Sequence, residues 1–260
     1  MSKTPQFDEA LDEYFAKLEL DENGGQWRTC RFSGKKFYVR PEDIEFYKRI
    51  RVPLPTLSPH ERTRRKLGHT NFFNLFRTTS AYSGKTIVAA YPPTTPYKIY
   101  EHKVWNSDNW DPFEFGIRYD TSRGFFDQYR ELQLSVPRPN LFSVQSTNSD
   151  YTNTVYNVRD CYLVFDAFEA EDCAYSSWLE YSKRCYNCYG ILKSDTCYES
   201  QTCEDSFKLF FSELSRNCME SAFLYDCRNC EYCFGCTNLR NKKYCFLNEQ
   251  LTKEEYKKRI

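Results

Sequence analysis

Cysteine recurs at multiples of three residues along the C-terminal half of this chain, and this spacing constrains the fold more than any other feature. Twelve of the thirteen cysteines share one register modulo three, with Cys30 as the exception. Reading every third residue from Ser143 to Leu239 gives 33 positions, occupied by 11 Cys, 11 Ser, 4 Leu, 3 Val, 2 Ala, 1 Thr and 1 Ile. None of these positions is charged or aromatic. A period of three fits neither the 3.6 residues of a helical turn nor the two-residue repeat of a strand.

A longer period of twelve residues accompanies the period of three. One column continues without insertion through Cys161, Cys173, Cys185, Cys197, Leu209, Ser221, Cys233 and Cys245. If every third side chain points inward, each twelve-residue rung has four short sides, and successive rungs stack about 4.8 Å apart by strand pairing. Such a rung encloses little volume, so Cys and Ser fit inside it, and buried hydroxyl groups can bond to nearby backbone. We therefore predict a narrow β-solenoid, or β-helix, of about eight to nine rungs over residues 143–250, with inward Cys/Ser ladders.

In rung length and inward spacing, this repeat resembles the beetle antifreeze proteins, which are tight β-solenoids with Cys, Ser and Ala inside. The resemblance implies a similar geometry and does not extend to function. That family binds ice through a Thr-Cys-Thr ladder, whereas the residues that follow the column here are Tyr162, Ala174, Tyr186, Tyr198, Phe210, Ala222, Phe234 and Phe246.

The outward columns differ from one another. The outward column that begins at Tyr162 is mostly apolar, and so is the column next to it. This second column contains Tyr151, Leu163, Tyr175, Phe211, Phe223 and Leu247. We expect this aromatic side to pack against the N-terminal half of the chain or against a second copy, which would make a homo-oligomer. Two further sides carry charge: one has Arg159-Asp160, Glu171-Asp172 and Lys183-Arg184, and the other has Arg216-Asn217, Arg228-Asn229 and Arg240-Asn241. The first predicts a solvated face, and the second is either a solvated edge or a row of arginines that follows phosphates.

The 36 basic and 36 acidic residues give no net charge but are unevenly distributed. Residues 1–27 carry 2 basic and 7 acidic side chains, residues 28–98 carry 15 and 4, and residues 99–260 carry 19 and 25. The sequence contains neither a signal peptide nor a run of 18 apolar residues, so we predict a cytoplasmic protein that has reduced thiols and does not contact membranes.

Three helices are expected outside the solenoid. Residues 1–27 form an N-terminal amphipathic helix ended by Gly24-Gly25, with one apolar face made of Phe7, Leu11, Tyr14, Phe15 and Leu18. A connecting segment, residues 119–142, has a helix that runs from Asp120 and stops before Pro137. Residues 251–260 form a C-terminal capping helix, which begins at the capping box Thr252-Lys-Glu-Glu255 and covers the open end of the solenoid.

A short internal repeat lies in the basic segment. Cys30-Arg-Phe-Ser33-Gly34-Lys35 recurs 50 residues later as Ser80-Ala-Tyr-Ser83-Gly84-Lys85. Both copies look like CxxCGK zinc knuckles in which cysteine has become serine, and the candidate partner pairs are Ser58 with Glu61 and Glu101 with Val104. Zinc requires thiolate or imidazole ligands in such sites. We therefore predict a paired, degenerate zinc-ribbon-like domain over residues 28–118, with no metal and no cofactor.

From Cys30 to its C-terminus the chain resembles a group of candidate-phyla bacterial proteins in which paired zinc ribbons precede a cysteine-rich repeat. The matching motifs are Pro41-Glu-Asp-Ile-Glu-Phe-Tyr-Lys48, Trp105-Asn-Ser-Asp-Asn-Trp110-Asp-Pro112, Val136-Pro-Arg-Pro139 and Asn238-Leu-Arg-Asn-Lys-Lys-Tyr-Cys245. The resemblance implies a bacterial protein of α+β class with ribbons followed by a repeat, and it implies no particular activity. The chain departs from the group at seven of eight ribbon ligands.

A basic helix between the two knuckles is the main candidate for binding. Ser58-Pro59-His60-Glu61 is a capping box, and the helix that follows carries Arg62, Arg64, Arg65 and Lys66. Together with Lys35, Lys36 and Lys85, and with the nearby rings of Phe72, Phe73 and Phe76, this helix predicts contact with nucleic acid or a ribonucleoprotein. The alternative is a solvated basic helix over an aromatic core, but the net charge of +11 over residues 28–98 is more than solubility requires.

Other chemistry is less well supported. Cys227, Cys230, Cys233 and Cys236 have a spacing close to that of iron–sulfur ligands, although the inward triplet rule already accounts for them. His60, His69 and His102 show no catalytic or ligand spacing with cysteine, and solenoid thiols should be buried and inert. We therefore predict a non-enzymatic binding module. A structural or assembly scaffold that uses the aromatic side is one alternative, and an iron–sulfur or zinc protein is the other.

Overall fold

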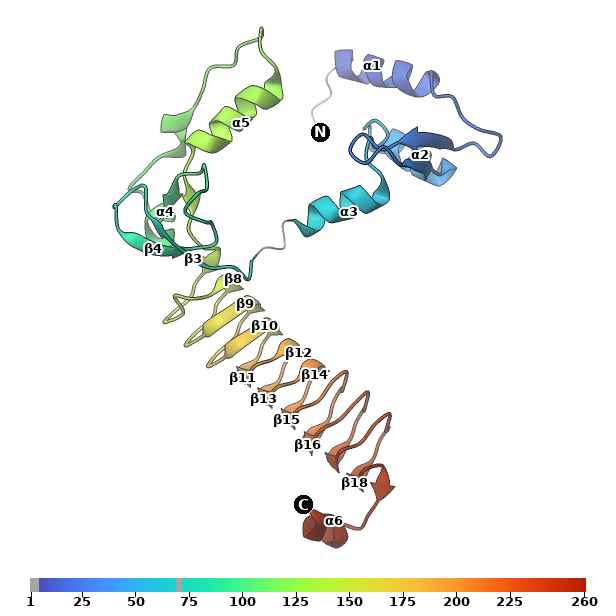
Figure 1. Ribbon diagram of the computed structural model, residues 1–260, viewed down its shortest axis with the longest axis vertical. Helices are drawn as coiled ribbons and strands as arrows, with labels where there is room; N and C mark the ends of the chain where they lie inside the picture. The colour runs from blue at the N-terminus through green and yellow to red at the C-terminus, as the bar shows by residue number, and fades with distance from the viewer. Residues whose placement is uncertain (1–4, 69–71) are drawn as a thin grey trace. The chain divides into compact units, whose positions relative to one another are not determined.

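The computed structural model describes residues 5–68 and 72–260, and His69 lies outside the described residues (Figure 1). The chain divides into two compact units, Met1–Asn71 and Phe72–Ile260. The boundary between the units falls inside the basic segment, so the two Ser-Gly-Lys turns belong to different units. No helix within the described ranges has the length and hydrophobicity that crossing a bilayer requires.

The first unit is a hairpin with three helices. Its elements are α1 (Pro5–Ala16), β1 (Gln26–Thr29), β2 (Lys36–Val39), α2 (Pro41–Arg49) and α3 (Pro59–Leu67). Strands β1 and β2 pair antiparallel. The core contains Cys30, Phe37, Val39, Ile44 and Leu54, against which Tyr14, Phe15 and Leu18 pack.

Helix α1 is shorter than predicted, because it ends at Ala16 and not at Gly24-Gly25. Residues 21–25 form a turn and not a helix end, because the carboxylate of Asp21 accepts hydrogen bonds from the backbone amides of Asn23 and Gly25 at 3.0 Å each. These bonds offer the backbone an alternative to the helix and form a turn that leads into β1. Residue 25 must be glycine, since a Cβ there would lie 2.1 Å from the hydroxyl oxygen of Tyr38.

The second unit begins with another hairpin, followed by short elements. They are β3 (Phe76–Thr79), β4 (Thr86–Ala89), β5 (Ile99–Tyr100), α4 (His102–Trp105), the 3-10 helix η1 (Pro112–Phe115), α5 (Phe125–Ser135) and β6 (Arg138–Pro139). Strands β3 and β4 pair antiparallel, and β5 pairs with β6 in parallel. Helix α5 ends before Pro137, as predicted, but it begins at Phe125 and not at Asp120. The reason is that Asp120 lies in a turn, where its backbone amide and carbonyl bond to the side chain of Gln128.

The predicted β-solenoid is present, with about nine turns. Its strands are β7 (Ser143–Val144), β8 (Asn153–Tyr156), β9 (Tyr162–Phe168), β10 (Ala174–Glu180), β11 (Lys183–Tyr186), β12 (Tyr189–Leu192), β13 (Asp195–Tyr198), β14 (Gln201–Glu204), β15 (Phe207–Phe210), β16 (Met219–Ala222), β17 (Glu231–Phe234) and β18 (Lys243–Phe246). These strands pair in parallel with residues twelve apart opposite each other, as in Cys185 with Cys197 and Cys233 with Cys245. All of the solenoid cysteines are free and buried. The twelve-residue rung and the inward cysteine column are therefore confirmed.

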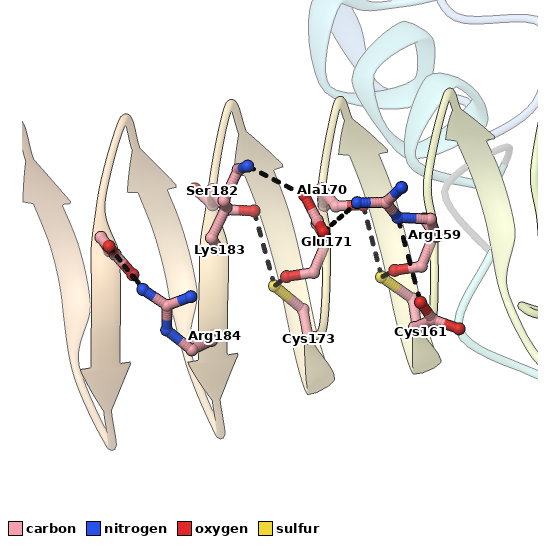
Figure 2. A network of polar contacts seen from close by, with 10 residues as sticks. Arg159, Cys161, Ala170, Glu171, Cys173, Ser182, Lys183 and Arg184 are labelled. Atoms are coloured by element: carbon pink, nitrogen blue, oxygen red, sulfur yellow. Dashed lines mark hydrogen bonds and ion pairs between the residues drawn. The ribbon is translucent and has the colours of Figure 1, made fainter.

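Inward hydroxyl and thiol groups bond to the backbone of adjacent rungs. The thiol of Cys173 donates to the carbonyl oxygens of Glu171, at 3.2 Å, and Ser182, at 3.7 Å (Figure 2). The same sulfur accepts from the amide of Cys185 at 3.5 Å. The same three bonds recur at Ser176. Its hydroxyl donates to the carbonyl two residues before it and to the carbonyl nine residues after it, and it accepts from the amide twelve residues after it. Small polar side chains thus fill the lumen and also satisfy backbone groups that face it.

A feature that the sequence analysis did not predict is the conformation of the corners. Every third residue from Thr154 to Leu247, the one before each inward position, has a positive φ. This left-handed conformation turns the chain after each short side, and it favours Gly, Asn and Asp. Bulky residues such as Trp178 and Phe211 also adopt it here, at φ 57° and 48°.

The C-terminal end of the solenoid is covered by chain. Strand β19 (Glu249–Gln250) folds back antiparallel to β18, and α6 (Lys253–Arg259) follows. The predicted capping box is present: Thr252 accepts from the amide of Glu255, whose carboxylate accepts from the amide of Thr252. Tyr256 is buried, with its ring centroid 5.9 Å from that of Tyr244 in β18.

Candidate nucleic-acid interface

The basic helix α3 forms where the sequence predicts it. Ser58 caps the helix by accepting a hydrogen bond from the amide of Glu61 at 3.3 Å, and Pro59 occupies the first turn. The carboxylate of Glu61 does not complete a capping box. It is buried and accepts from Nε of Arg64 at 2.9 Å through both oxygens.

The four predicted cations of α3 therefore do not act alike. Arg62 is half-buried and donates to the hydroxyl of Tyr47 at 3.0 Å, while Arg64 is paired with Glu61. Arg65 and Lys66 are exposed and form no ion pair with any described residue. Two of the four cations thus already have partners in the folded unit.

An aromatic ring lies beside this helix. Phe32 is 61% exposed, and the guanidinium carbon of Arg64 lies 4.8 Å from the centre of its ring. The turn that carries Phe32 is tied to the chain before α3 by a hydrogen bond of 2.8 Å from the amide of Arg31 to the carbonyl of Thr56. The structure places Phe32 on the surface. Its position inside a tight four-residue turn, where side chains face outward, was the signal that could have identified it.

Other predicted members of the interface are distributed between the units. Lys35 and Lys36 are exposed at the end of the Phe32 turn, in the same unit as α3. Lys85 is exposed in the second unit, which also contains Phe72, Phe73 and Phe76. The ring of Phe73 packs on that of Phe165 in the solenoid, with centroids 5.5 Å apart. These three phenylalanines therefore belong to a different unit from α3.

The charge of the first unit is smaller than that of the basic segment. Residues 1–71 contain 14 basic and 11 acidic side chains, a net charge of +3, because the acidic α1 belongs to this unit. Arg51 forms ion pairs with Asp8, at 2.9 Å, and with Asp12. Lys35, Lys36, Arg65 and Lys66, which pair with no acidic side chain in the described part of the chain, thus add positive charge to a nearly neutral unit.

Cys30, Ser33 and Ser58 of the first unit are linked by hydrogen bonds. Burial raises the pKa of the Cys30 thiol, but the Ser33 hydroxyl and the backbone amides of Ser58, Ser33 and Phe32 outweigh it and lower this pKa to about 6. The thiol is 1% exposed. Cys30, Ser33 and Ser58 thus lie close together, with one cysteine among them.

A carboxylate holds the second Ser-Gly-Lys turn. The hydroxyl groups of Ser80 and Ser83 both donate to the carboxylate of Glu101. Burial works to raise the pKa of Glu101, but these two hydroxyl groups lower it below its ordinary value. Within the described ranges, no group of three or more His, Cys, Asp or Glu residues is arranged to hold a metal ion.

The same finding bears on the string Cys227, Cys230, Cys233 and Cys236. The thiols of these residues donate to backbone carbonyls, for example from Cys227 to the carbonyl of Cys236 at 3.4 Å. Burial raises the pKa of the Cys227 thiol, whereas the hydrogen bond with Cys233 lowers the pKa of Cys236 to about 6, so the four thiols do not share one electrostatic environment. The iron–sulfur alternative therefore receives no support from the arrangement of the four cysteines.

The aromatic side of the solenoid is exposed in the second unit. Its rings stack on one another, with centroids 4.9 Å apart for Phe211 and Phe223 and 5.6 Å apart for Phe234 and Phe246. Tyr162, Tyr175 and Phe223 are 45%, 57% and 49% exposed. The described residues of this unit therefore leave the aromatic side open.

The two charged sides of the solenoid form ion-paired ladders. Glu171 pairs with Arg159 and with Lys183, and Arg184 pairs with Asp195 at 2.5 Å (Figure 2). On the second charged side, the repeated arginines also have acidic partners. Arg216 pairs with Glu204, and Arg228 and Arg240 pair with Asp226. Amide groups stack beside them, from Asn217 to Asn229 to Asn241. Since these arginines are neutralised by their own chain, the solvated edge is the better interpretation of this side.

In comparisons with known proteins, the chain matches no family model and no curated protein sequence.

Proposed function

We propose that the first unit binds single-stranded nucleic acid through the surface formed by the Phe32 turn and α3. The observation that carries this proposal is the pair of Phe32 and Arg64, an exposed ring with a guanidinium group stacked on it. An exposed ring can stack on a nucleic-acid base, and an arginine beside it adds a cation–π contact and a donor for phosphate.

Four cations that form no ion pair with any described residue adjoin this pair along the chain. Lys35 and Lys36 follow the ring along the turn, and Arg65 and Lys66 follow Arg64 along the helix. Positive charge next to a stacking ring is typical of proteins that bind single strands with little sequence preference. Double-stranded DNA would hide its bases from Phe32, so a single strand fits this surface better.

The degenerate knuckle fits this proposal as a support that needs no zinc. Hydrogen bonds among Cys30, Ser33 and Ser58 fix the turn that carries Phe32. All thirteen cysteines are free, which suits a reducing compartment such as the cytoplasm.

Fluorescence anisotropy with labelled RNA and DNA strands of about 15 nucleotides, measured over a range of salt concentrations, tests the proposal. Wild-type protein should bind with an affinity that falls steeply as salt rises, because phosphate contacts release counterions. The double variant Arg65→Ala/Lys66→Ala should reduce the slope of log K against log salt by about 1.4, since each contact with a single strand contributes about 0.7.

Phe32→Ala should weaken binding about tenfold with little change in that slope, because stacking does not depend on counterions. A matched control is Lys17→Ala/Lys48→Ala, which removes two cations that are paired with Glu13 and Glu45 in the same unit. The proposal fails if wild-type protein binds neither strand at low salt, or if the control lowers the affinity as much as the α3 variant does.

A scaffold function is the second candidate, and the exposed aromatic side of the solenoid favours it. Stacked rings on an open sheet can pair with those of a second copy. Sedimentation equilibrium tests this candidate: self-association that Tyr175→Ser and Phe223→Ser together abolish would support it, and a monomer at all concentrations would reject it.

A further inference from the structure

A groove of about 660 Å³ follows one side of the solenoid, across the successive rungs that include β8, β9, β10 and β12. It is open along its length and is lined mostly by apolar side chains. Because successive rungs lie about 4.8 Å apart, the groove is longer than a single compact ring and suits an extended ligand. The column of Tyr156, Phe168 and Glu180 continues on later rungs into the ion-paired column of Arg216, Arg228 and Arg240, so the groove occupies the earlier rungs of that side and is separate from the aromatic side.

Aromatic rings form the walls of the groove. Tyr156 and Phe168 stack on adjacent rungs, with centroids 5.1 Å apart and an angle of 8° between the rings. Trp178, on the other wall, is 52% exposed and stacks against Tyr189 with centroids 5.6 Å apart. The faces of such rings attract cations and cover aliphatic chains.

Two carboxylates, Asp166 and Glu180, also line the groove. Neither forms an ion pair with any residue in the described part of the chain, whereas Glu171 and Asp195 on the charged sides do. Burial, and then the charge of Glu180, raise the pKa of Asp166, so the two groups lie near enough to repel each other. The free protein therefore holds a pair of negative charges that its own cations do not balance.

Gly190 keeps the groove open. Its φ of +69° is matched at other corners by residues that carry large side chains, so the conformation alone does not require glycine. A Cβ at this position would meet only Thr202, at 3.5 Å, which is an ordinary contact. At Gly235, by contrast, a Cβ would lie 2.7 Å from the side chain of Leu247. The packing around residue 190 would thus accept a side chain, and the glycine there leaves empty space beside Trp178.

We propose that this groove binds a linear aliphatic amine, a diamine or polyamine. Its ammonium groups would pair with Asp166 and Glu180, and its methylene groups would lie along Trp178 and Phe168. Charge complementarity favours such a ligand over a neutral sugar, and the open, elongated shape favours a flexible chain over a compact cation. The site does not depend on the first unit, so the proposal stands apart from nucleic-acid binding.

Isothermal titration calorimetry of the full-length chain with 1,6-diaminohexane and with 1,6-hexanediol tests the proposal, because the two probes share length and differ in charge. Spermidine provides a longer probe of the same class. The diamine should bind at least tenfold more tightly than the diol. Asp166→Asn and Glu180→Gln should each weaken diamine binding about tenfold, since each removes a charged hydrogen-bond partner while keeping the shape.

Three further variants complete the test. Glu213→Gln removes a carboxylate that is exposed and outside the groove, so it should leave binding unchanged. Gly190→Phe should abolish binding by filling the groove, as Phe211 shows that a corner can carry a phenyl ring. Gly190→Ala keeps the space and should bind as wild type does. Asparagine tolerates positive φ well, so Asp166→Asn should fold.

Equal affinity for diol and diamine would overturn the proposal in favour of a purely apolar groove. Absence of diamine binding at millimolar concentration, or undiminished binding by Glu180→Gln, would overturn it as well. If Asp166→Asn failed to fold, the comparison of the two probes with wild-type protein and with Glu180→Gln would still decide the matter.

Discussion

Replacing Cys173 with phenylalanine tests the inward assignment of the solenoid most directly. Cys173 is 1% exposed and lies in a column with Cys161 on the rung before it and Cys185 on the rung after it. A phenyl ring has no room in this lumen, so the side chain must displace neighbours or the rung must open. Overpacking of this kind costs about 1–3 kcal/mol. The loss of the thiol bonds to Glu171 and Ser182 adds about 1 kcal/mol, which gives a total of about 3 kcal/mol.

Thermal and urea unfolding under reducing conditions, followed by circular dichroism, would measure this loss. For a chain of this length, 3 kcal/mol corresponds to a fall in Tm of about 6–12 °C. Cys173→Ala removes the thiol bonds without overpacking and should cost only about 1 kcal/mol. Tyr175→Phe, at an outward position that is 57% exposed, should change stability by less than about 0.5 kcal/mol.

Hydrogen exchange would locate the effect. Each rung contacts only its neighbours, so Cys173→Phe should lose amide protection in β9, β10 and β11 and keep it in β17 and β18. If Cys173→Phe had the same Tm as wild type, the side chain of residue 173 would not point into the lumen. The reasoning from the triplet register would then fail.

Chelation with EDTA should leave the Tm unchanged, and elemental analysis should find neither zinc nor iron; one zinc per chain bound at Cys30 would contradict this. Glu101→Gln should lower the Tm of the second unit, because an amide accepts more weakly than the carboxylate that Ser80 and Ser83 now hold. Since the pKa of Glu101 is lower in the folded protein, its contribution to stability is present above the ordinary carboxyl pKa and is lost as pH falls through the folded value. Wild type should therefore lose more stability than Glu101→Gln when the pH is lowered through that range, and parallel losses would refute the assignment. Glu199→Asn should raise the Tm by about 2–4 °C, because asparagine tolerates the φ of +49° at this corner better than glutamate does; an unchanged or lower Tm would show that corner strain is not limiting.

The sequence was sufficient to predict the rung and its interior. Steric exclusion inside a narrow coil acts at every rung, so the column from Cys161 to Cys245 repeats the same constraint until it is visible without a structure. The capping box at Thr252 was equally readable, because its bonds join residues only three apart. Constraints that act between near neighbours in the chain, or that repeat on every rung, leave a pattern in the sequence.

Features that depend on a single tertiary partner leave no such pattern. Arg62 and Arg65 are alike in sequence, and only the fold brings Tyr47 within 3.0 Å of one of them. The left-handed corners are repeated but were hidden, because their positions hold residues as different as Trp178 and Asn229. The groove was missed for another reason: Asp166 and Gly190 share a column but Glu180 lies in another, and each column holds different residue types on successive rungs.

The bonds of the lumen make the solenoid adjustable in length by fixed steps. An inward side chain bonds to backbone groups two residues before it and nine and twelve residues after it, as at Ser176, and these offsets are unchanged when a whole rung is added or removed. Gain or loss of twelve residues within this repeat would therefore preserve the hydrogen-bonded lumen and move the C-terminal cap by about 4.8 Å. A change of any number not divisible by three would turn outward side chains into the lumen at every later rung. Duplication and deletion of whole rungs thus offer evolution, or a protein engineer, a way to set the separation between the amine groove and the capped end.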